Sequence, residues 1–407
     1  MKRLILTILC AAFLCACGTE PDGAAVLPMP EAVRETAAPV DWELILKSRT
    51  VDLLYPSATE RVSLWTLGVR EDHAGKLSAT DSAMRDYIGA LCAAYSVPAV
   101  DAAVSDGGSY EEPFVYTAER EGSRPSAEKL LDALQTLDFT LSSQAIRVPM
   151  EPVGAAVTQK DLERTHTLLS SYTTSFKGEK LGKKNRVHNI TVAASRINGV
   201  KVDPGETFSM NRTIGDRTKA NGYKLAGAIT NGMNTTEYGG GVCQVSTTLF
   251  NAVLMADLTI VERYHHSWPM EYAPVGRDAT IATGMKDFRF RNDGNEPVYI
   301  FATVDETAKT VSVSLYGKKS DAFDHIEIVS EQTGRLPAKA GEVHLDESLP
   351  SGTREIERKG RRGRTSVTYL DYYDANGERI KRVTAFEDVY PSIGEIAYVS
   401  ADLYNGR

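Results

Sequence analysis

Apolar and polar side chains repeat along this chain with two periods, one typical of helices and one typical of strands. Residues 78–97 and 126–137 repeat apolar side chains with helical spacing, and the second of these segments opens on a serine that can cap a helix. Residues 113–117 and 144–148 are short β-prone runs of the length that strands have. This mixture predicts a small α+β module over residues 42–165.

The segment YGGGVCQVSTTLFNAVL, residues 238–254, joins three glycines to a cysteine and a helical repeat. Val245, Leu249 and Val253 fall at i, i+4 and i+8, so they share one face of a helix. Cys243 therefore lies at or beside a helix N-terminus, where the partial positive charge favours the thiolate. A thiol in that position is a candidate nucleophile.

The last part of the chain has the alternation of strands. Residues 365–373 alternate Thr, Val and Tyr side chains, and an Ala-Asn-Gly turn at 375–377 precedes a returning strand. This pattern predicts a β-rich domain over residues 318–400. Taken together, the chain is expected to be a multi-domain α+β protein.

The N-terminus has the pattern of an export signal. Two basic residues precede a short apolar run, 4–14, which is too short to span a membrane, and a signal peptide is expected over residues 1–16. The ending Leu-Cys-Ala-Cys resembles the bacterial lipobox, which implies lipidation of Cys17. An ordinary signal peptide, with Cys17 as a bystander, is the alternative. Polar residues 17–41 are expected to be a disordered tether, so we expect an exported chain, lipid-anchored at the outer face of the cell membrane.

Composition narrows the function. The 407 residues carry a formal net charge of −8, which argues against nucleic acid as a partner. The histidines show no spacing typical of a metal site, and the glycine run is not followed by the Lys-Ser/Thr of a phosphate-binding loop, so neither metal nor cofactor is expected. Removal of the signal would leave Cys17, Cys92 and Cys243, which do not suggest a disulfide framework.

The central region, residues 166–305, resembles the VanW family closely. The matching segments, in chain order, are SSYTTSF (170–176), RVHNITVAASRINGVKVDPGETFSMN (186–211), IGDRT (214–218), NGYKLAGAI (221–229), YGGGVCQVSTTLFNAVL (238–254), ERYHHSWPMEYAPVGRDATI (262–281) and KDFRFRND (286–293). The family is named after an accessory member of vancomycin-resistance gene clusters. The resemblance implies a role in the cell envelope and in peptidoglycan biology, and it leaves the biochemical activity open.

The flanking regions carry weaker resemblances. Residues 42–165 are similar in pattern to the YoaR-type peptidoglycan-binding module that often precedes VanW domains. Residues 318–400 resemble the five-glycine domain of surface proteins that bind wall sugars, because their glycines and the Val-Tyr-Pro ending match its loose pattern. Both resemblances imply peptidoglycan or wall glycan as the partner.

A thiol nucleophile needs a base, and the chain offers one directly after the cysteine helix. His265 and His266 are followed by Asp278, and we expect both segments to be strands. Adjacent residues on a strand point to opposite faces, so only one histidine can face the thiol. The His-Ser element of VanW-type sequences matches His266. The order of Cys, His and Asp resembles the rearranged branches of the papain-like superfamily, in which the Cys helix packs on a sheet.

Two functions follow from this constellation. In the first, the chain is a cysteine-dependent acyl transferase or amidase acting on peptidoglycan peptides: Cys243 attacks a carbonyl, His266 transfers the proton and Asp278 orients the imidazole. In the second, the chain is a non-catalytic peptidoglycan- or glycan-binding scaffold. His266 is then a structural histidine, Asp278 a strand-end cap and Cys243 a packed thiol.

The residues around the cysteine also have two interpretations. Gly239, Gly240 and Gly241 either make room for a substrate or form a tight loop against another part of the backbone. Gln244 either binds a substrate carbonyl or caps the loop. We assign these four residues to substrate binding as a hypothesis.

Overall fold

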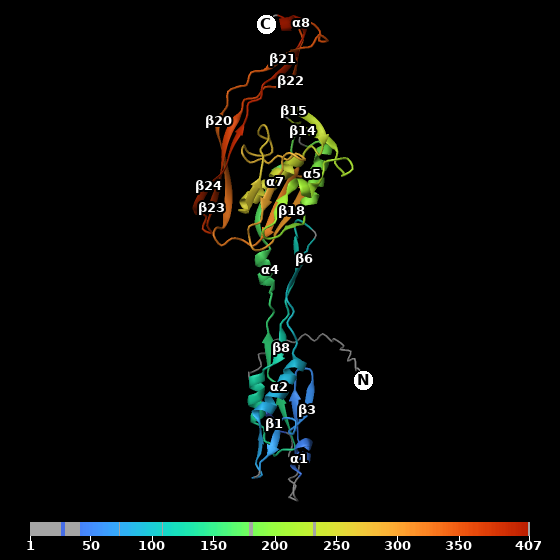
Figure 1. Cartoon of the computed structure of the whole chain (residues 1–407), viewed down its shortest axis with the longest axis vertical. Helices are drawn as coiled ribbons and strands as arrows, with labels where there is room; N and C mark the ends of the chain where they lie inside the picture. Colours follow the sequence, from blue (N-terminus) through green and yellow to red (C-terminus); the bar gives the residue numbers. More distant parts are fainter. Residues whose placement is uncertain are drawn as a thin grey trace. The chain divides into compact units, whose positions relative to one another are not determined.

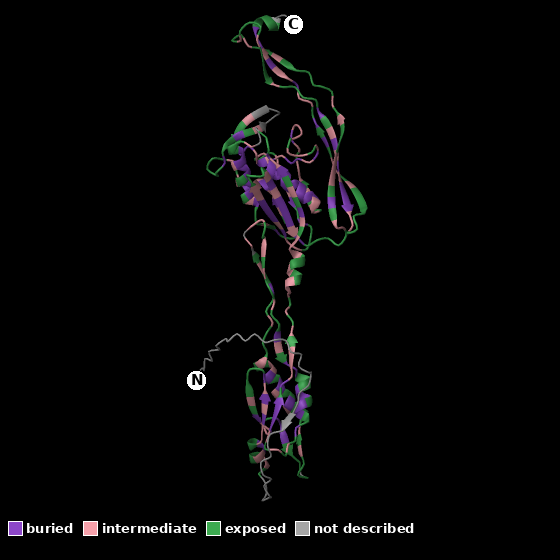
Figure 2. Ribbon diagram, turned by 180° about the vertical axis from the view of Figure 1, so that it is seen from behind, coloured by how far each residue is buried: buried purple, intermediate pink, exposed green. Residues whose placement is uncertain are grey.

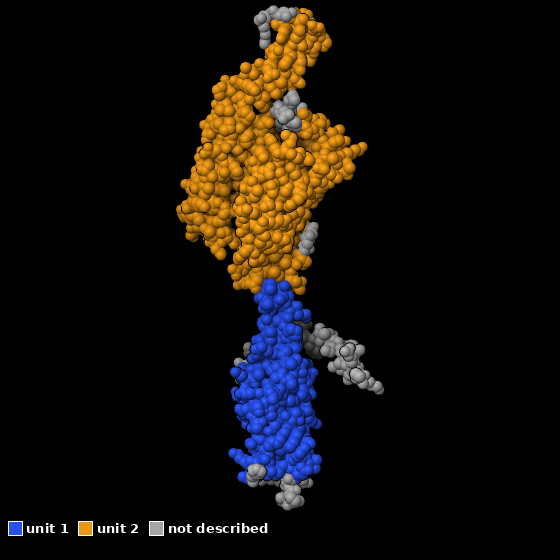
Figure 3. Space-filling view, viewed as in Figure 1, with its two compact units in different colours: residues 1–102, 118–158 blue, residues 103–117, 159–407 orange. Residues whose placement is uncertain are grey.

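The computed structural model describes residues 26–28, 41–72, 74–107, 109–178, 182–230 and 233–405. It divides the chain into two compact units (Figure 3): Met1–Ala102 with Ala118–Thr158, and Ala103–Thr117 with Gln159–Arg407. Helices and strands occur in both units, so the predicted α+β class is confirmed. The expected signal peptide and Cys17 lie outside the described residues.

The first unit is built on a four-stranded sheet in the order β1-β9-β2-β3, in which only β2 and β9 are parallel. Its strands and helices are β1 Val26–Pro28, α1 Trp42–Ser48, β2 Thr50–Leu54, β3 Thr59–Ser63, β4 Val69–Glu71, β5 Leu77–Ala79, α2 Asp81–Tyr95, β8 Gly122–Pro125, α3 Ala127–Gln135, β9 Ser143–Arg147 and β10 Met150–Val153. The two predicted helices, α2 and α3, are confirmed, and their apolar faces join one hydrophobic core.

Strand β1 lies inside the segment that was expected to be a disordered tether. Its backbone pairs antiparallel with β9, so the expectation was wrong for these three residues. The physical reason is that an open sheet edge presents unpaired N–H and C=O groups that a nearby segment can satisfy. Strand β7, which the sequence also predicted, belongs to the second unit.

The second unit has an antiparallel sheet in the order β11-β19-β18-β12 at its centre. These strands are β11 Thr167–Ser175, β12 Val200–Val202, β18 Val298–Asp305 and β19 Thr310–Gly317. Helices α5 (Lys184–Ile197) and α7 (Val242–Met255) contact each other and pack on this sheet (Figure 1). The Cys-bearing helix is thus supported by a sheet.

Smaller elements surround this centre. They are β6 Ala103–Asp106, β7 Phe114–Thr117, α4 Gln159–Thr165, β13 Thr207–Ser209, α6 Met210–Ile214, β14 Leu225–Thr230, β15 Met233–Tyr238, β16 Thr259–Glu262 and β17 Arg289–Arg291. The pairs β6-β7 and β14-β15 form two-stranded sheets, and β13-β17-β16 form a three-stranded sheet.

The C-terminal region is β-rich, as predicted. Its elements are β20 His325–Arg335, β21 Glu342–Leu345, β22 Arg354–Arg358, β23 Arg364–Tyr373, β24 Arg379–Tyr390, β25 Ile396–Val399 and the short helix α8 Ala401–Asn405. Two three-stranded sheets result, β20-β23-β24 and β21-β25-β22. Gly377, with φ of 82°, forms the predicted turn between β23 and β24 because few other residues adopt that backbone conformation.

Helix α7 is buried on every side, although the sequence pattern suggested one apolar face. All residues from Gln244 to Leu254 are buried, and buried residues, purple in Figure 2, gather at the centre of the second unit. The reason is that α7 packs between the central sheet and β20, so two regions far apart in the chain cover it. In the part of the chain that the structure describes, no helix is long and apolar enough to cross a membrane.

Candidate active site

Cys243 is the second residue of α7, as the sequence predicted. The N-cap residue, Gly241, has φ of 113°, a left-handed conformation that a residue with a side chain would adopt at a cost. The sulfur lies 3.6 Å from Thr280 Oγ1 and 3.6 Å from the carbonyl oxygen of Ile281. Cys243 is partly exposed, and it belongs to the edge of the hydrophobic core.

His266 and Asp278 do not lie on strands, and in this the sequence prediction was wrong. Residues 263–281 contain no strand. Their backbone N–H groups donate to side chains instead of to a neighbouring strand, as those of His266 and Ala279 do. The backbone N–H of His266 donates to Asp278 Oδ2 at 2.7 Å, and its ring nitrogen Nδ1 faces the same oxygen at 2.5 Å. The imidazole is therefore held in one orientation by a carboxylate.

The imidazole also reaches the thiol. Its Nδ1 faces Asp278, so the other ring nitrogen is the one left for the hydrogen bond with Cys243. Burial raises the pKa of Cys243, but the hydrogen bond and charge of His266 outweigh it and lower the pKa to about 7. Burial lowers the pKa of His266, but its bonds to Asp278 and Cys243 raise the pKa to about 9. A thiol that ionises below its base forms a thiolate–imidazolium pair near neutral pH.

Asp278 is 1% exposed, and its charge is compensated from several sides. Besides the two bonds from His266, Oδ1 accepts the hydroxyl of Tyr390 and lies 3.6 Å from the guanidinium of Arg263. Burial raises the pKa of Asp278, but the hydrogen bond and charge of His266 lower it more, and the carboxyl stays ionised. These partners explain how a buried carboxylate is tolerated here.

Tyr390 is a site residue that sequence reasoning missed. It is 1% exposed at the end of β24, and besides bonding Asp278 its hydroxyl accepts the backbone N–H of Gly276 at 3.0 Å. The β-rich C-terminal region therefore supplies the last member of the hydrogen-bonded series Cys243–His266–Asp278–Tyr390. The signals in the sequence are the Val-Tyr-Pro ending, which contains Tyr390, and the position of Asp388 and Tyr390 on one face of a strand.

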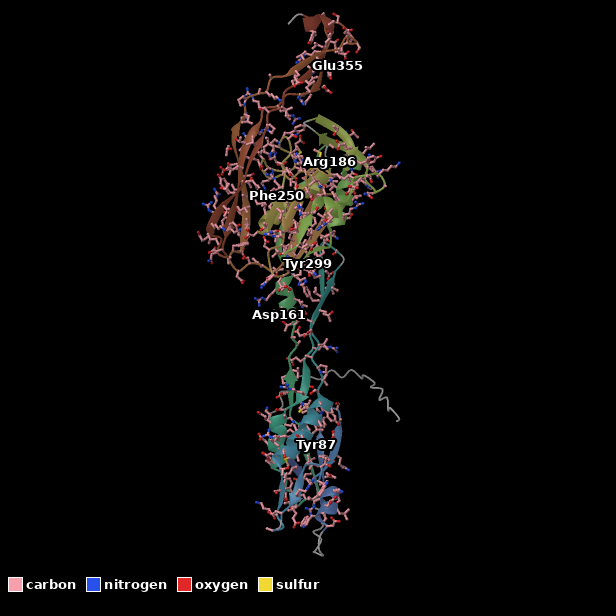
Figure 4. The ribbon with its side chains drawn as sticks, viewed as in Figure 1. Tyr87, Asp161, Arg186, Phe250, Tyr299 and Glu355 are labelled. Atoms are coloured by element: carbon pink, nitrogen blue, oxygen red, sulfur yellow. The ribbon has the colours of Figure 1, made fainter. Side chains whose placement is uncertain are left out.

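Arg263 ties the same two regions together, and sequence reasoning missed it too. Its Nη1 lies 2.6 Å and 2.8 Å from the two carboxylate oxygens of Asp388 on β24. Its Nε donates to the carbonyl oxygen of Asp278 at 2.8 Å, and its guanidinium lies 5.1 Å from the ring of Phe250 on α7, which Figure 4 labels. This buried ion pair is supported by hydrogen bonds on every side of the guanidinium.

A polar stripe on α7 aligns the Asp278 segment with the cysteine. Thr247, four residues after Cys243, accepts the N–H of Ala279 at 3.1 Å and lies 3.3 Å from its carbonyl oxygen. Asn251, four residues further, exchanges two bonds of 2.8 Å with Arg277. The spacing i, i+4, i+8 of Cys243, Thr247 and Asn251 was visible in the sequence and could have been read as a second face of the helix.

The three glycines serve packing. A side chain at Gly240 would lie 2.6 Å from the carbonyl oxygens of Ala226 and Gly227, so the loop runs directly against β14. Gly239 and Gly241 have positive φ and abut arginine side chains. These close contacts are those of a tight loop, which was one of the two sequence interpretations of the glycines.

Gln244 points away from the sulfur. Its side chain is fully buried, and Nε2 donates to Thr174 Oγ1 of β11 at 3.0 Å. Of the sequence-predicted site residues, the structure brings Cys243, His266 and Asp278 together and places Gln244 elsewhere.

Two further side chains flank the thiol. The guanidinium of Arg186, on α5, lies 5.9 Å from the ring of Tyr272, and that ring lies 6.4 Å from the ring of His266. Burial lowers the pKa of Arg186, while Tyr272 and Cys243 raise it. Arg186 (labelled in Figure 4) places a second positive charge near the thiolate. Within the described residues, no group of three or more His, Cys, Asp or Glu side chains could hold a metal ion.

The region that carries these residues matches a known family. The family model described as "VanW like protein" matches residues 185–316. The chain contains a VanW-like region over these residues. The resemblance drawn from the sequence motifs is therefore confirmed.

Two curated relatives agree with this. The chain is 48% identical over 134 residues to "Uncharacterized protein YoaR" of Bacillus subtilis (strain 168), which is 33% of this chain and 43% of that protein. It is 36% identical over 150 residues to "Vancomycin B-type resistance protein VanW" of Enterococcus faecalis (strain ATCC 700802 / V583), which is 36% of this chain and 54% of that protein. The chain thus spans about half the length of the curated relatives it matches.

Solved structures of G5 domains are also similar to part of the chain. "Crystal structure of HP0197-G5" matches 19% of this chain and 100% of its own, with 20% identity and a TM-score of 0.11. "IgA1 Protease G5 domain structure" matches 19% of this chain and 94% of its own, with 14% identity and a TM-score of 0.13.

Proposed function

We propose that this VanW-family chain is a cysteine-dependent acyl transferase or amidase that acts on peptidoglycan peptides. The observation that supports it best is the hydrogen-bonded series Cys243–His266–Asp278, with the sulfur at a helix N-terminus and its pKa lowered to about 7. A packed structural thiol has no need of a buried imidazole fixed by a buried carboxylate.

The reaction has two halves. The thiolate of Cys243 attacks the carbonyl carbon of an amide, and the oxyanion lies near the N–H groups of the first turn of α7. The imidazolium of His266 gives its proton to the leaving amine, the C–N bond breaks and a thioester remains. Neutral His266 then takes a proton from water or from an acceptor amine, which attacks the thioester; the C–S bond breaks, and the released thiolate restores the pair with the imidazolium. Water gives hydrolysis, and an amine gives transfer.

The setting of the reaction belongs to the same proposal. One relative carries vancomycin resistance in its name, which supports an envelope substrate. The basic and apolar residues at the N-terminus support export, and the lipobox-like ending supports an anchor at Cys17 on the outer face of the cell membrane.

A non-catalytic glycan-binding scaffold is the second candidate. The observation that favours it is that the glycine run packs tightly and His266 is only 7% exposed. In this function the buried polar series would fix the α7 region against the C-terminal sheet, and glycan would bind elsewhere.

The test compares the two free cysteines of the described chain. Wild type, Cys243→Ala and Cys92→Ala are each incubated with muropeptides, and the products are identified by mass spectrometry. We expect turnover to fall by about 10³-fold or more in Cys243→Ala and to stay within twofold in Cys92→Ala. Equal amounts of product from wild type and Cys243→Ala would support the non-catalytic scaffold. So would a wild-type protein that binds sacculi and forms no product.

A further inference from the structure

A groove of about 400 Å³ lies beside the triad within the second unit. Trp268 and Pro269, which follow His266 closely in the chain, form part of its wall, and Tyr390 forms another part. Four arginines also line it: Arg335, Arg361, Arg362 and Arg364. All four are exposed, so a ligand in the groove can reach them.

The strand register places two of these arginines in one row with Tyr390. Arg335 of β20 is paired with Arg364 of β23, and Arg364 is paired with Tyr390 of β24. Directly paired residues on neighbouring strands project to the same face of a sheet. The face that sends the Tyr390 hydroxyl to Asp278 therefore also carries two guanidinium groups.

None of the four arginines takes part in an ion pair among the described residues, whereas the carboxylates of Asp388 and Asp371 on the same sheet each pair with another arginine. Arg263 is paired with Asp388, and Arg382 is paired with Asp371. Like charges directly across a strand pair, such as Arg335 and Arg364, are destabilising. A bound anion would offset that repulsion.

The groove also holds one arginine in place. The guanidinium of Arg361 lies 4.4 Å from the centre of the Trp268 ring, a cation–π distance. A guanidinium stacked on an aromatic ring keeps its N–H groups free at its edge, in the planar geometry that matches a carboxylate or a phosphate. The groove thus has both charge and a fixed donor.

We infer that this groove binds a linear polyanion whose phosphodiester or carboxylate groups recur along the polymer. A single carboxylate neutralises one arginine, and only repeated charges neutralise four. The inference goes beyond the proposed function, since the groove does not need Cys243 to be catalytic.

The experiment measures binding by the full chain, with no catalytic readout. Fluorescently labelled polyphosphate, poly-glutamate, neutral dextran and a single-stranded RNA of equal length are titrated in fluorescence anisotropy at low and high salt. We expect polyphosphate or poly-glutamate to bind, more weakly at high salt, and dextran not to bind. The tighter of the two anionic polymers identifies phosphate or carboxylate as the group recognised.

The variant Arg361→Gln with Arg364→Gln tests the groove. We expect its affinity for the anionic polymer to fall by about tenfold to a hundredfold, because each charge-assisted bond contributes at least about a factor of ten. Its control, Arg85→Gln with Arg120→Gln, makes the same change in charge on exposed residues of the first unit, and we expect it to bind within twofold of wild type.

Circular dichroism melting of both variants verifies that they fold. Unchanged affinity in the folded groove variant, equal loss in the control, absence of binding to either anionic polymer, or tighter binding of RNA than of both would each overturn the inference. Because Cys243→Ala is expected to bind as wild type does, loss of activity and loss of binding are separable.

Discussion

The two free cysteines of the described chain share most of what a sequence can show, and they differ in chemistry. Cys92 on α2 and Cys243 on α7 are both partly exposed, and both pack at the edge of a hydrophobic core. Burial raises the pKa of Cys92, whereas that of Cys243 is lowered to about 7.

The difference lies in the neighbours. Cys92 lies 3.5 Å from the carbonyl oxygen of Pro125, and burial raises its pKa more than the charge of Arg124 lowers it. Cys243 has an imidazole whose own pKa is raised to about 9, and an imidazolium stabilises the thiolate. Burial acts on both sulfurs in the same direction, so one placed histidine decides which cysteine is reactive.

The largest effect should come from removing that histidine. In His266→Gln, Cys243 keeps its burial and loses the imidazolium, so its pKa should rise to the ordinary value or above. The thiolate fraction at pH 7, and with it the rate of iodoacetamide alkylation, should fall about fiftyfold. Mass spectrometry of labelled peptides measures both cysteines in one sample, and Cys92 is the internal control. A Cys243 that reacts as fast as before would show that the imidazole does not activate it.

The next largest effect is expected in the pH dependence of turnover and of alkylation, which should differ between the two cysteines. Thiolate at Cys243 forms as pH rises through about 7, and His266 loses its proton as pH rises through about 9, so turnover should peak between these values. A lowered thiol pKa contributes stability that is lost as pH falls through about 7, and a raised imidazole pKa contributes stability that is lost as pH rises through about 9. Alkylation of Cys92 should rise only in more alkaline solution. Identical pH profiles of alkylation for Cys243 and Cys92 would contradict the proposed difference in their pKa.

Tyr390→Phe should have a smaller effect, because it acts through Asp278. The carboxylate loses one donor, its pKa should rise, and turnover should fall about tenfold, with the acidic limb of the pH profile shifted. Tyr372→Phe is the matched control. Tyr372 lies on β23 in the same sheet as Tyr390, and its hydroxyl donates to Asp257 at 2.6 Å, away from Asp278. Both variants should lose similar stability in urea denaturation. A shifted pH profile in the control, or none in Tyr390→Phe, would assign Tyr390 a purely structural role.

The smallest effect is expected from Thr247→Val, which keeps the shape of the side chain and loses the contacts with Ala279. We expect a loss of about 1–2 kcal/mol in the free energy of unfolding and a modest drop in Cys243 alkylation. Thr248→Val, one residue further on α7, removes bonds to the carbonyl of Gln244 and to the hydroxyl of Thr174 instead. It should cost similar stability and leave the alkylation rate unchanged. Equal alkylation in both variants would show that the stripe does not position the triad.

The local sequence pattern predicted the elements whose stabilising interactions lie within a few residues. Helices α2, α3 and α7 and the β23-β24 turn follow from spacing, caps and glycine within a few residues. The same reasoning failed for residues 263–281, because strand propensity there is overridden by backbone hydrogen bonds to side chains, of Asp278 within the segment and of Thr247 and Tyr390 from other elements. It also failed for the outer face of α7, which β20 from the distant C-terminal region helps to cover.

The sequence by itself determined that a cysteine opens a helix, that a histidine and an aspartate follow it, and that the central region is of the VanW type. Those properties depend on chain order and on short-range periodicity. Only the tertiary structure decided that Asp278 is held by Tyr390 from 112 residues away, and that four arginines meet beside them. The physical reason is that a buried charge is stable only where partners from distant segments converge on it, and no local pattern encodes that convergence.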